Sequence, residues 1–231
     1  MPEEAINKTT YSTAKSVEIY SQLYLWPYEK VLFDRYITPG LSVLDVGCGT
    51  GRSTYFLNQR GVTVIGIDMV EAFINHGHEL YPELDLRLMN ATKLEFPDNS
   101  FDIVFFSNQG IDYTDRRLDV LREVYRVTKP GGVFAYSSHN SLYLPRTKKG
   151  WVNFGRNLRY FRLGYHFRIE HHPNGDLHVA HNNIWNEAKT LRQLGFKVIE
   201  ILSNSQRFSS LPKLITGLFT RWPLFVCRKP L

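Results

Sequence analysis

The sequence contains little cysteine: its 231 residues include two, Cys48 and Cys227, which stand far apart. A pair so placed cannot form a disulfide framework, and this predicts a protein of a reducing compartment. The chain also lacks the run of about 20 apolar residues that a membrane-spanning helix requires. Its first residues, MPEEAINK, carry acids where a secretory signal carries basic residues. These absences predict a cytoplasmic protein without membrane insertion.

Acidic residues are missing from two later stretches. Residues 140–169 contain seven Lys or Arg side chains and no acid, and residues 202–231 contain five and no acid. The formal net charge of +6 is therefore concentrated in the later part of the chain. A positive field there favours anionic ligands.

Short apolar runs alternate with segments of helical periodicity over most of the chain. We predict strands at residues 42–47, 62–68, 84–91, 101–107, 132–138, 197–202 and 223–229. We predict helices at residues 13–37 (divided at Pro27), 51–60, 70–81, 115–128 and 184–194. This order predicts an α/β fold with a doubly wound, mostly parallel, seven-stranded sheet and helices on both faces.

The same pass along the chain predicts three parts. We expect residues 1–39 to form an N-terminal helical cap, and residues 40–139 with 183–231 to form the core. Residues 140–182 show no clear period and are rich in aromatic and basic side chains. This break in the alternation predicts an inserted lid over a substrate.

A glycine-rich loop, VLDVGCGTGRST at residues 43–54, follows the first predicted strand. A dinucleotide fingerprint requires a third glycine where this chain has Arg52, and a phosphate-binding P-loop requires a lysine that is not present. Asp45 would repel a phosphate and attract a ligand that carries a sulfonium and an ammonium. The loop therefore favours a cationic nucleoside without phosphates. Asp68, which ends the second predicted strand, is placed to accept the hydroxyl groups of a ribose.

These residues and three later segments resemble the class I (Rossmann-like) S-adenosylmethionine-dependent methyltransferases of the small-molecule type. VLDVGCGTG and VIGIDMV are similar to the family's first two motifs, and LRLMNATKLEFPDNSFDIVFFS and LREVYRVTKPGGVFAYS to its later ones. The resemblance implies S-adenosylmethionine as the cofactor. It also implies the cofactor-binding residues Asp45, Gly47, Cys48, Gly49, Gly51, Asp68, Met69, Asn90, Ala91, Ser107 and Asn108. Asn90 stands where an aspartate is usual, which predicts an altered adenine contact.

Candidate catalytic residues follow the fourth and fifth predicted strands, where an acceptor of the methyl group should lie. His139 is our candidate for a general base, or for a donor that orients the acceptor. Asp112 and Tyr113 are candidates for substrate contact, and Asp112 has the alternative role of a helix cap. Tyr20 and Tyr24 are placed to close over the site or simply to pack their helix on the core.

The segment at 166–181 contains His166, His171, His172, His178 and His181. We predict a loop or hairpin that contacts substrate and no metal site, because Pro173, Asn174 and Gly175 indicate a turn.

The basic aromatic insertion favours a small anionic or aromatic metabolite as the methyl acceptor. An RNA methyltransferase and a non-catalytic S-adenosylmethionine-binding subunit are the alternatives. The oligomeric state is not predicted.

Overall fold

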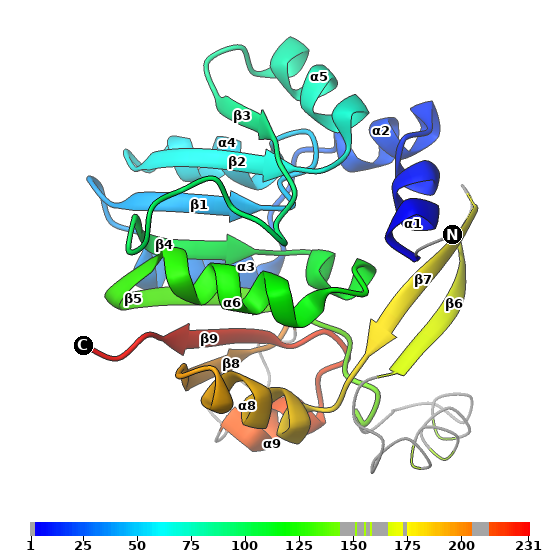
Figure 1. The fold of residues 1–231 in the computed structure, drawn as a ribbon, viewed down its shortest axis with the longest axis vertical. Helices are drawn as coiled ribbons and strands as arrows, with labels where there is room; N and C mark the ends of the chain where they lie inside the picture. The colour runs from blue at the N-terminus through cyan, green and yellow to red at the C-terminus, as the bar shows by residue number, and fades with distance from the viewer. Residues whose placement is uncertain are drawn as a thin grey trace.

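A seven-stranded sheet forms the centre of the protein in a computed structural model, which describes residues 3–143, 151, 155, 158, 166–172, 175–204 and 213–231. The strand order is β3-β2-β1-β4-β5-β9-β8, and β9 is antiparallel to both of its neighbours while β1 to β5 pair in parallel. The strands are β1 (Ser42–Val46), β2 (Thr63–Asp68), β3 (Asp85–Leu88), β4 (Phe101–Phe106), β5 (Thr128–Ser137), β8 (Lys197–Leu202) and β9 (Leu224–Arg228). The predicted α/β fold is confirmed (Figure 1).

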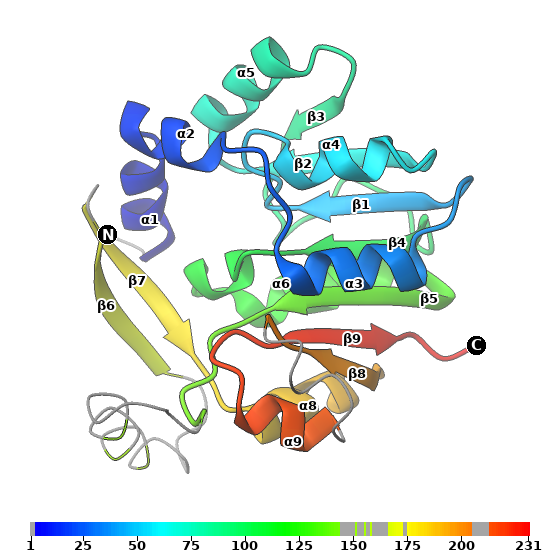
Figure 2. The same cartoon turned by 180° about the vertical axis from the view of Figure 1, so that it is seen from behind.

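Helices pack against both faces of this sheet. One face is covered by α6 (Arg117–Val127) and α8 (Ile184–Gln193), and the other by α3 (Pro27–Tyr36) and α4 (Arg52–Asn58) (Figures 1 and 2). Alternate residues of a strand point to opposite faces, so Leu44 of β1 joins the first core and Val43 joins the second. Two further helices pack near the edges of the sheet: α5 (Glu71–Leu80) on β2 and β3, and α9 (Lys213–Leu218) on β8.

The β5 strand begins earlier than predicted. The sequence Lys129-Pro130-Gly131-Gly132 indicates a turn before a strand at 132, but α6 ends at Val127 and β5 begins at the next residue. Thr128 pairs with Phe101 of β4, and the register then shifts before Ile103 pairs with Val133. A bulge of this kind, with Gly131 at a φ of +77°, accommodates the proline and glycines within the strand.

The N-terminal region contains three helices where the sequence analysis predicts one divided segment. Pro27 occupies the first turn of α3, where a missing N–H costs nothing, and α2 (Ala14–Tyr20) ends well before it. The helix α1 (Glu3–Tyr11) is not predicted by the sequence analysis, and neither is α9. In the part of the chain that the structure describes, none of the helices combines the length and apolar character of a membrane span.

The histidine-rich segment forms a hairpin of β6 (His166–His172) and β7 (Gly175–His181) that lies apart from the main sheet. Helix α1 packs on β7, so two segments far apart in the sequence lie side by side (Figures 1 and 2). About half of the predicted lid at 140–182, including most of its basic residues, lies outside the described residues. The three-part domain division stays a prediction.

Candidate functional site

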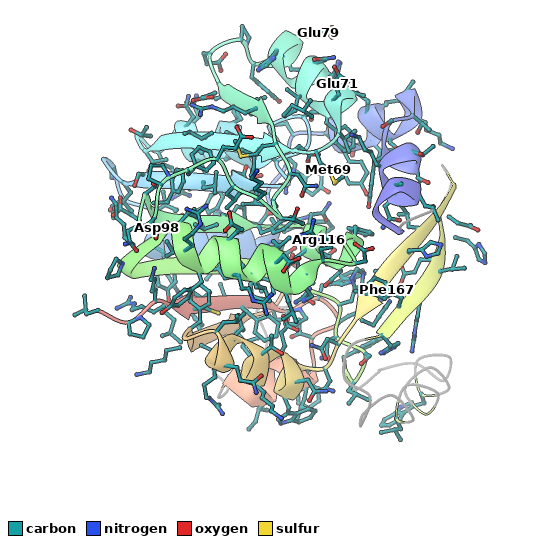
Figure 3. The ribbon with its side chains drawn as sticks, viewed as in Figure 1. Met69, Glu71, Glu79, Asp98, Arg116 and Phe167 are labelled. Carbon is teal, nitrogen blue, oxygen red and sulfur yellow. The ribbon has the colours of Figure 1, made fainter. Side chains whose placement is uncertain are left out.

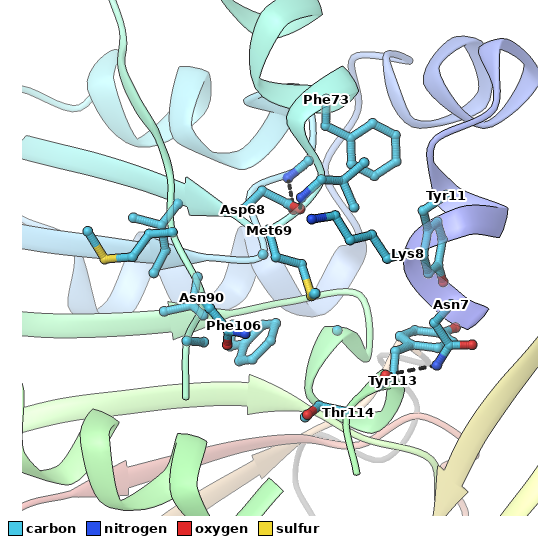
Figure 4. Close-up of a pocket in the computed structure, with 18 of the residues that line it drawn as sticks. Asn7, Lys8, Tyr11, Asp68, Met69, Phe73, Asn90, Phe106, Tyr113 and Thr114 are labelled. Atoms are coloured by element: carbon cyan, nitrogen blue, oxygen red, sulfur yellow. Dashed lines mark hydrogen bonds between the residues drawn. The ribbon is translucent and has the colours of Figure 1, made fainter. Parts of the chain in front are cut away.

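A cavity with about 880 Å³ of empty space, part of it open to solvent, lies at the carboxyl ends of β1, β2 and β4. Helix α1, helix α5 and a short 3-10 helix, η1 (Gly110–Tyr113), complete its walls. Figure 4 shows the cavity between these elements, and Figure 3 places Met69 at the same end of the sheet. Of the predicted residues, its lining includes Tyr20, Gly47, Gly49, Asp68, Met69, Asn90, Ala91, Ser107, Asn108 and Tyr113.

The glycine loop passes under this cavity in a conformation that side chains would disturb. Gly47 has a φ of +63°, and a Cβ there would lie 2.6 Å from the Phe106 ring. Gly51 precedes α4 with a φ of +92° and packs against Leu86. Gly47 and Gly49 line the cavity, whereas Gly51 and the buried Cys48 lie behind it. The loop therefore brings its backbone close to a ligand.

Asp68 is the acid that faces the cavity. Its Oδ2 accepts a hydrogen bond from the Gly49 N–H and its Oδ1 accepts one from the Val70 N–H, each at 2.9 Å. Burial raises the pKa of the Asp68 carboxyl. Each carboxylate oxygen has a further lone-pair direction available, so the two oxygens fit the paired hydroxyl groups of a ribose. This donor and acceptor set agrees with a nucleoside cofactor.

Asp45 lies beneath the loop and does not line the cavity. Its Oδ2 accepts hydrogen bonds from the hydroxyl groups of Ser53 and Thr54, each at 2.7 Å. Its Oδ1 is buried and has no hydrogen-bond partner among the described residues. Burial raises the pKa of Asp45 to about 6. Asp45 therefore holds the start of α4, and its predicted contact with the cofactor stays a prediction.

Asn90 and Ala91 line the cavity at the end of β3. The Asn90 Oδ1 accepts a hydrogen bond from the Thr92 N–H at 2.9 Å, which closes a local turn. This bond fixes the position of the amide at the cavity wall. The altered adenine contact predicted for Asn90 stays a prediction.

The segment after β4 has an unusual backbone. Asn108 and Gln109 both adopt positive φ, at 51° and 57°, a conformation that non-glycine residues adopt mainly where function requires it. The Gln109 N–H donates to the Ser137 hydroxyl at 2.8 Å, which fixes this turn to the end of β5. The turn places Ser107, Asn108 and Gly110 on the cavity wall.

Glu29 is a functional candidate that the sequence analysis misses. This carboxylate is fully buried and accepts two hydrogen bonds at 2.8 Å from the Arg52 guanidinium, one from the Trp26 N–H and one from the Ser107 hydroxyl. It thus joins α3, the glycine loop and the end of β4. The sequence contains one indication of this role, because Glu29 stands three residues after Trp26, at the capping-box position of α3.

Of the catalytic candidates, only Tyr113 lines the cavity. Asp112 and His139 lie behind it, both buried. The Asp112 Oδ2 accepts from the His139 N–H at 2.7 Å and from Nδ1 at 3.0 Å, while Oδ1 accepts from Ser138 and Arg117. Four donors occupy this carboxylate, so Asp112 is placed to orient His139, and its predicted contact with substrate stays a prediction.

Arg117 connects this pair to the rest of the core, and it is buried. Its guanidinium donates to Asp112 and to Glu187 of α8. Glu187 in turn accepts from the Tyr136 hydroxyl and, at 2.6 Å, from the Asn182 amide. These buried charges all have partners, as a stable buried network requires.

One histidine of the hairpin, His181, approaches the His139 ring. His181 lies 4.9 Å from it between ring centroids and bonds Glu170 through Nε2 at 3.1 Å. This bond to His181, together with the nearby His139 and Arg221, lowers the pKa of Glu170 to about 2. Within the described ranges, no three His, Cys, Asp or Glu side chains are grouped to hold a metal ion.

Tyr20, one of the two predicted closing tyrosines, lines the cavity with Tyr11 of α1 and Phe73 of α5. Tyr24 does not line it, and its ring instead lies 5.1 Å from the Arg52 guanidinium. Tyr11 also contacts Tyr113 edge to face, with ring centroids 5.4 Å apart. A continuous aromatic wall therefore covers one end of the cavity.

The chain is similar to known proteins in sequence and in fold. Residues 44–136 match a family model described as a methyltransferase domain. The demethylmenaquinone methyltransferase of Listeria welshimeri is 34% identical over 173 residues, which cover 68% of this chain and 71% of that protein. The demethylmenaquinone methyltransferase of Renibacterium salmoninarum is 40% identical over 103 residues, 44% of this chain but only 43% of that protein's length. Among solved structures, the Burkholderia thailandensis 1,6-didemethyltoxoflavin-N1-methyltransferase has a TM-score of 0.67 at 16% identity, covering 100% of this chain and 91% of that chain.

Proposed function

The chain belongs to the class I S-adenosylmethionine-dependent methyltransferase family, and on that premise we propose that it methylates an oxygen, nitrogen or carbon centre of a small molecule. One observation carries this proposal. The cavity lined by Gly47, Gly49 and Asp68 continues without a break to Tyr11 and Tyr113. A donor and an acceptor can therefore meet in one enclosed space.

Alignment is the main task of the protein in this reaction. When bound, S-adenosylmethionine would supply an electrophilic methyl group, which passes in line to the acceptor as S-adenosylhomocysteine leaves. Asp68 would hold the ribose, and the backbone of Gly47 and Gly49 would lie against the cofactor. The aromatic wall excludes water and fixes the acceptor opposite the methyl group, and such positioning contributes several kcal/mol to the lowering of the barrier.

His139 is the proposed base for an acceptor that must lose a proton. Its Nδ1 bonds the Asp112 carboxylate, an acceptor-only group, so the neutral imidazole carries its hydrogen on Nδ1 and a lone pair on Nε2. The His139 ring stands edge to face with Tyr113 at 6.4 Å between centroids. Because Tyr113 lines the cavity and its ring contacts that of His139, Tyr113 is the proposed contact for substrate.

The proposed acceptor is aromatic or anionic. Tyr11, Tyr20 and Tyr113 line the cavity and offer ring faces and edges for an aromatic acceptor. Arg221, which helps to lower the pKa of Glu170, is a cation that an anionic acceptor could approach. Two relatives are named for demethylmenaquinone and 1,6-didemethyltoxoflavin, which supports a small molecule over RNA.

The test has two stages. Calorimetry with S-adenosylhomocysteine comes first, and no binding would overturn the proposal. Labelled cofactor is then incubated with a small-molecule fraction and, separately, with the RNA fraction of a cell extract. Label in a small molecule supports the proposal, label in RNA supports the alternative, and binding without label in either indicates a non-catalytic subunit. Once the acceptor is known, His139→Gln should lower kcat about a hundredfold.

A further inference from the structure

Among the described residues, two charged side chains line the cavity, Asp68 and Lys8 of α1. Asp68 is a proposed contact for the ribose, and Lys8 has no role in the proposed function. Two other residues of α1, Asn7 and Tyr11, also line the cavity. Figure 4 shows the Lys8 side chain directed into the cavity toward Asp68.

Helix α1 holds Lys8 in place through Asn7. The Asn7 amide donates to the Tyr113 carbonyl at 2.8 Å and to the His178 carbonyl at 2.9 Å, and its oxygen accepts from the His178 N–H at 2.8 Å. The amide thus pairs with β7 as a neighbouring strand would. Because Asn7 is buried and fully bonded, the residue beside it has a fixed backbone from which a flexible lysine can reach.

The Lys8 ammonium forms no ion pair with a carboxylate in the part of the chain that the structure describes. Asp68, the acid nearest along the cavity wall, receives two backbone N–H groups instead. A cation at a cavity wall without an internal partner is available to an anionic ligand.

The cofactor brings one anionic group into this cavity, the carboxylate of its amino-acid end. A carboxylate that enters a partly buried site needs a charged or hydrogen-bonded partner, and Asp68 repels it. We propose that Lys8 binds the carboxylate of S-adenosylmethionine and of S-adenosylhomocysteine. The proposal rests on the proposed function, because it takes the cofactor as the occupant of the cavity.

The experiment removes the Lys8 ammonium and the carboxylate of the ligand in turn, and then both together. Calorimetry measures the binding of S-adenosylhomocysteine and of its decarboxylated form, S-adenosyl-3-thiopropylamine, which keeps the amine and lacks the carboxylate. Both ligands are titrated into the wild type and into Lys8→Met, Lys8→Arg and Lys15→Met. Lys15 is the matched control, since it is an exposed lysine of α2 that does not line the cavity.

We expect Lys8→Met to weaken S-adenosylhomocysteine about ten- to a hundredfold, the range of a hydrogen bond between charged groups. The decarboxylated ligand should change by less than about threefold, Lys8→Arg should recover most of the affinity, and Lys15→Met should leave both ligands unaffected. Equal weakening of both ligands, or no weakening of either, would overturn the assignment. If the wild type binds neither ligand, the proposed function fails instead, so the two failures are distinguishable.

Discussion

The two ends of the cavity are built in different ways. At the proposed cofactor end, the loop from Gly47 to Gly51 and Asp68 come from two adjacent strands of the sheet, and backbone N–H groups of Gly49 and Val70 bond the Asp68 carboxylate. At the proposed acceptor end, Asp112, Arg117, His139 and Glu187 lie behind the cavity wall, come from four separate segments and are joined by side-chain hydrogen bonds and ion pairs. The cofactor end therefore depends on the local geometry of the backbone. The acceptor end depends on a side-chain network that is disrupted when any one member is removed.

The acceptor end should therefore respond to a single charge removal with a large loss of stability. Arg117→Met leaves the buried carboxylates of Asp112 and Glu187 without a counter-ion, and breaking such a pair costs about 3 to 5 kcal/mol. Urea unfolding should show this loss in the free energy of unfolding.

Arg116→Met is the matched control for this change. Arg116 is the adjacent residue, its side chain is 58% exposed, and its partner Asp119 lies at the surface. Surface pairs contribute about 0 to 1 kcal/mol, so the control should lose no more than that. Equal losses for the two variants would show that the Arg117 network does not stabilise the acceptor end.

At the cofactor end, a single substitution should weaken ligand binding while the protein stays folded. Asp68→Ala removes the acceptors for a ribose and for two backbone N–H groups, so S-adenosylhomocysteine should bind about a hundredfold more weakly, a change of about 3 kcal/mol. Calorimetry measures the affinity, and circular dichroism should show that the variant stays folded. Asp68→Asn, which keeps one acceptor oxygen, should lose less. Unchanged affinity in both variants would remove Asp68 from the cofactor site.

Asp45 gives the cofactor end a pH dependence. Its folded-state pKa of about 6 exceeds the ordinary value near 4, so the native state binds the proton more tightly than the unfolded state. The contribution is fully present below about pH 4 and is lost as the pH rises through about 6, by about 2 to 3 kcal/mol.

The free energy of unfolding should therefore decline between pH 4.5 and 6.5 in the wild type, relative to Asp45→Asn. The asparagine keeps an oxygen for the Ser53 and Thr54 hydroxyls and does not titrate. Parallel pH profiles of the two proteins would contradict the raised pKa.

The same contrast explains what the sequence reveals. The glycine loop, Asp68 and the seven strands follow from short-range spacing and hydrophobic periodicity, and the structure has them near the predicted positions, apart from the earlier start of β5. Residue spacing cannot reveal that Arg117 joins Asp112 to Glu187, because the two carboxylates are far apart in the chain. Asp45 illustrates a further limit: charge arguments predict its contact with the ligand, which stays a prediction, but they do not reveal its hydrogen bonds to Ser53 and Thr54. Helix α1 escapes prediction because its apolar face is short, and its position depends on the Asn7 bonds to β7.

Asn7 lies where the two ends meet, so its replacement should have a small but specific effect. Asn7→Asp keeps the size of the side chain and removes both donors to the Tyr113 and His178 carbonyls, which places two acceptors against a carboxylate. Helix α1 should then open more often, and S-adenosylhomocysteine should dissociate about tenfold faster in stopped-flow experiments, equivalent to about 1.4 kcal/mol. Asn58→Asp is a control at the end of α4, away from the cavity. A dissociation rate equal to that of the wild type would mean that α1 does not retain the cofactor, and that the cofactor end holds its ligand without help from the acceptor end.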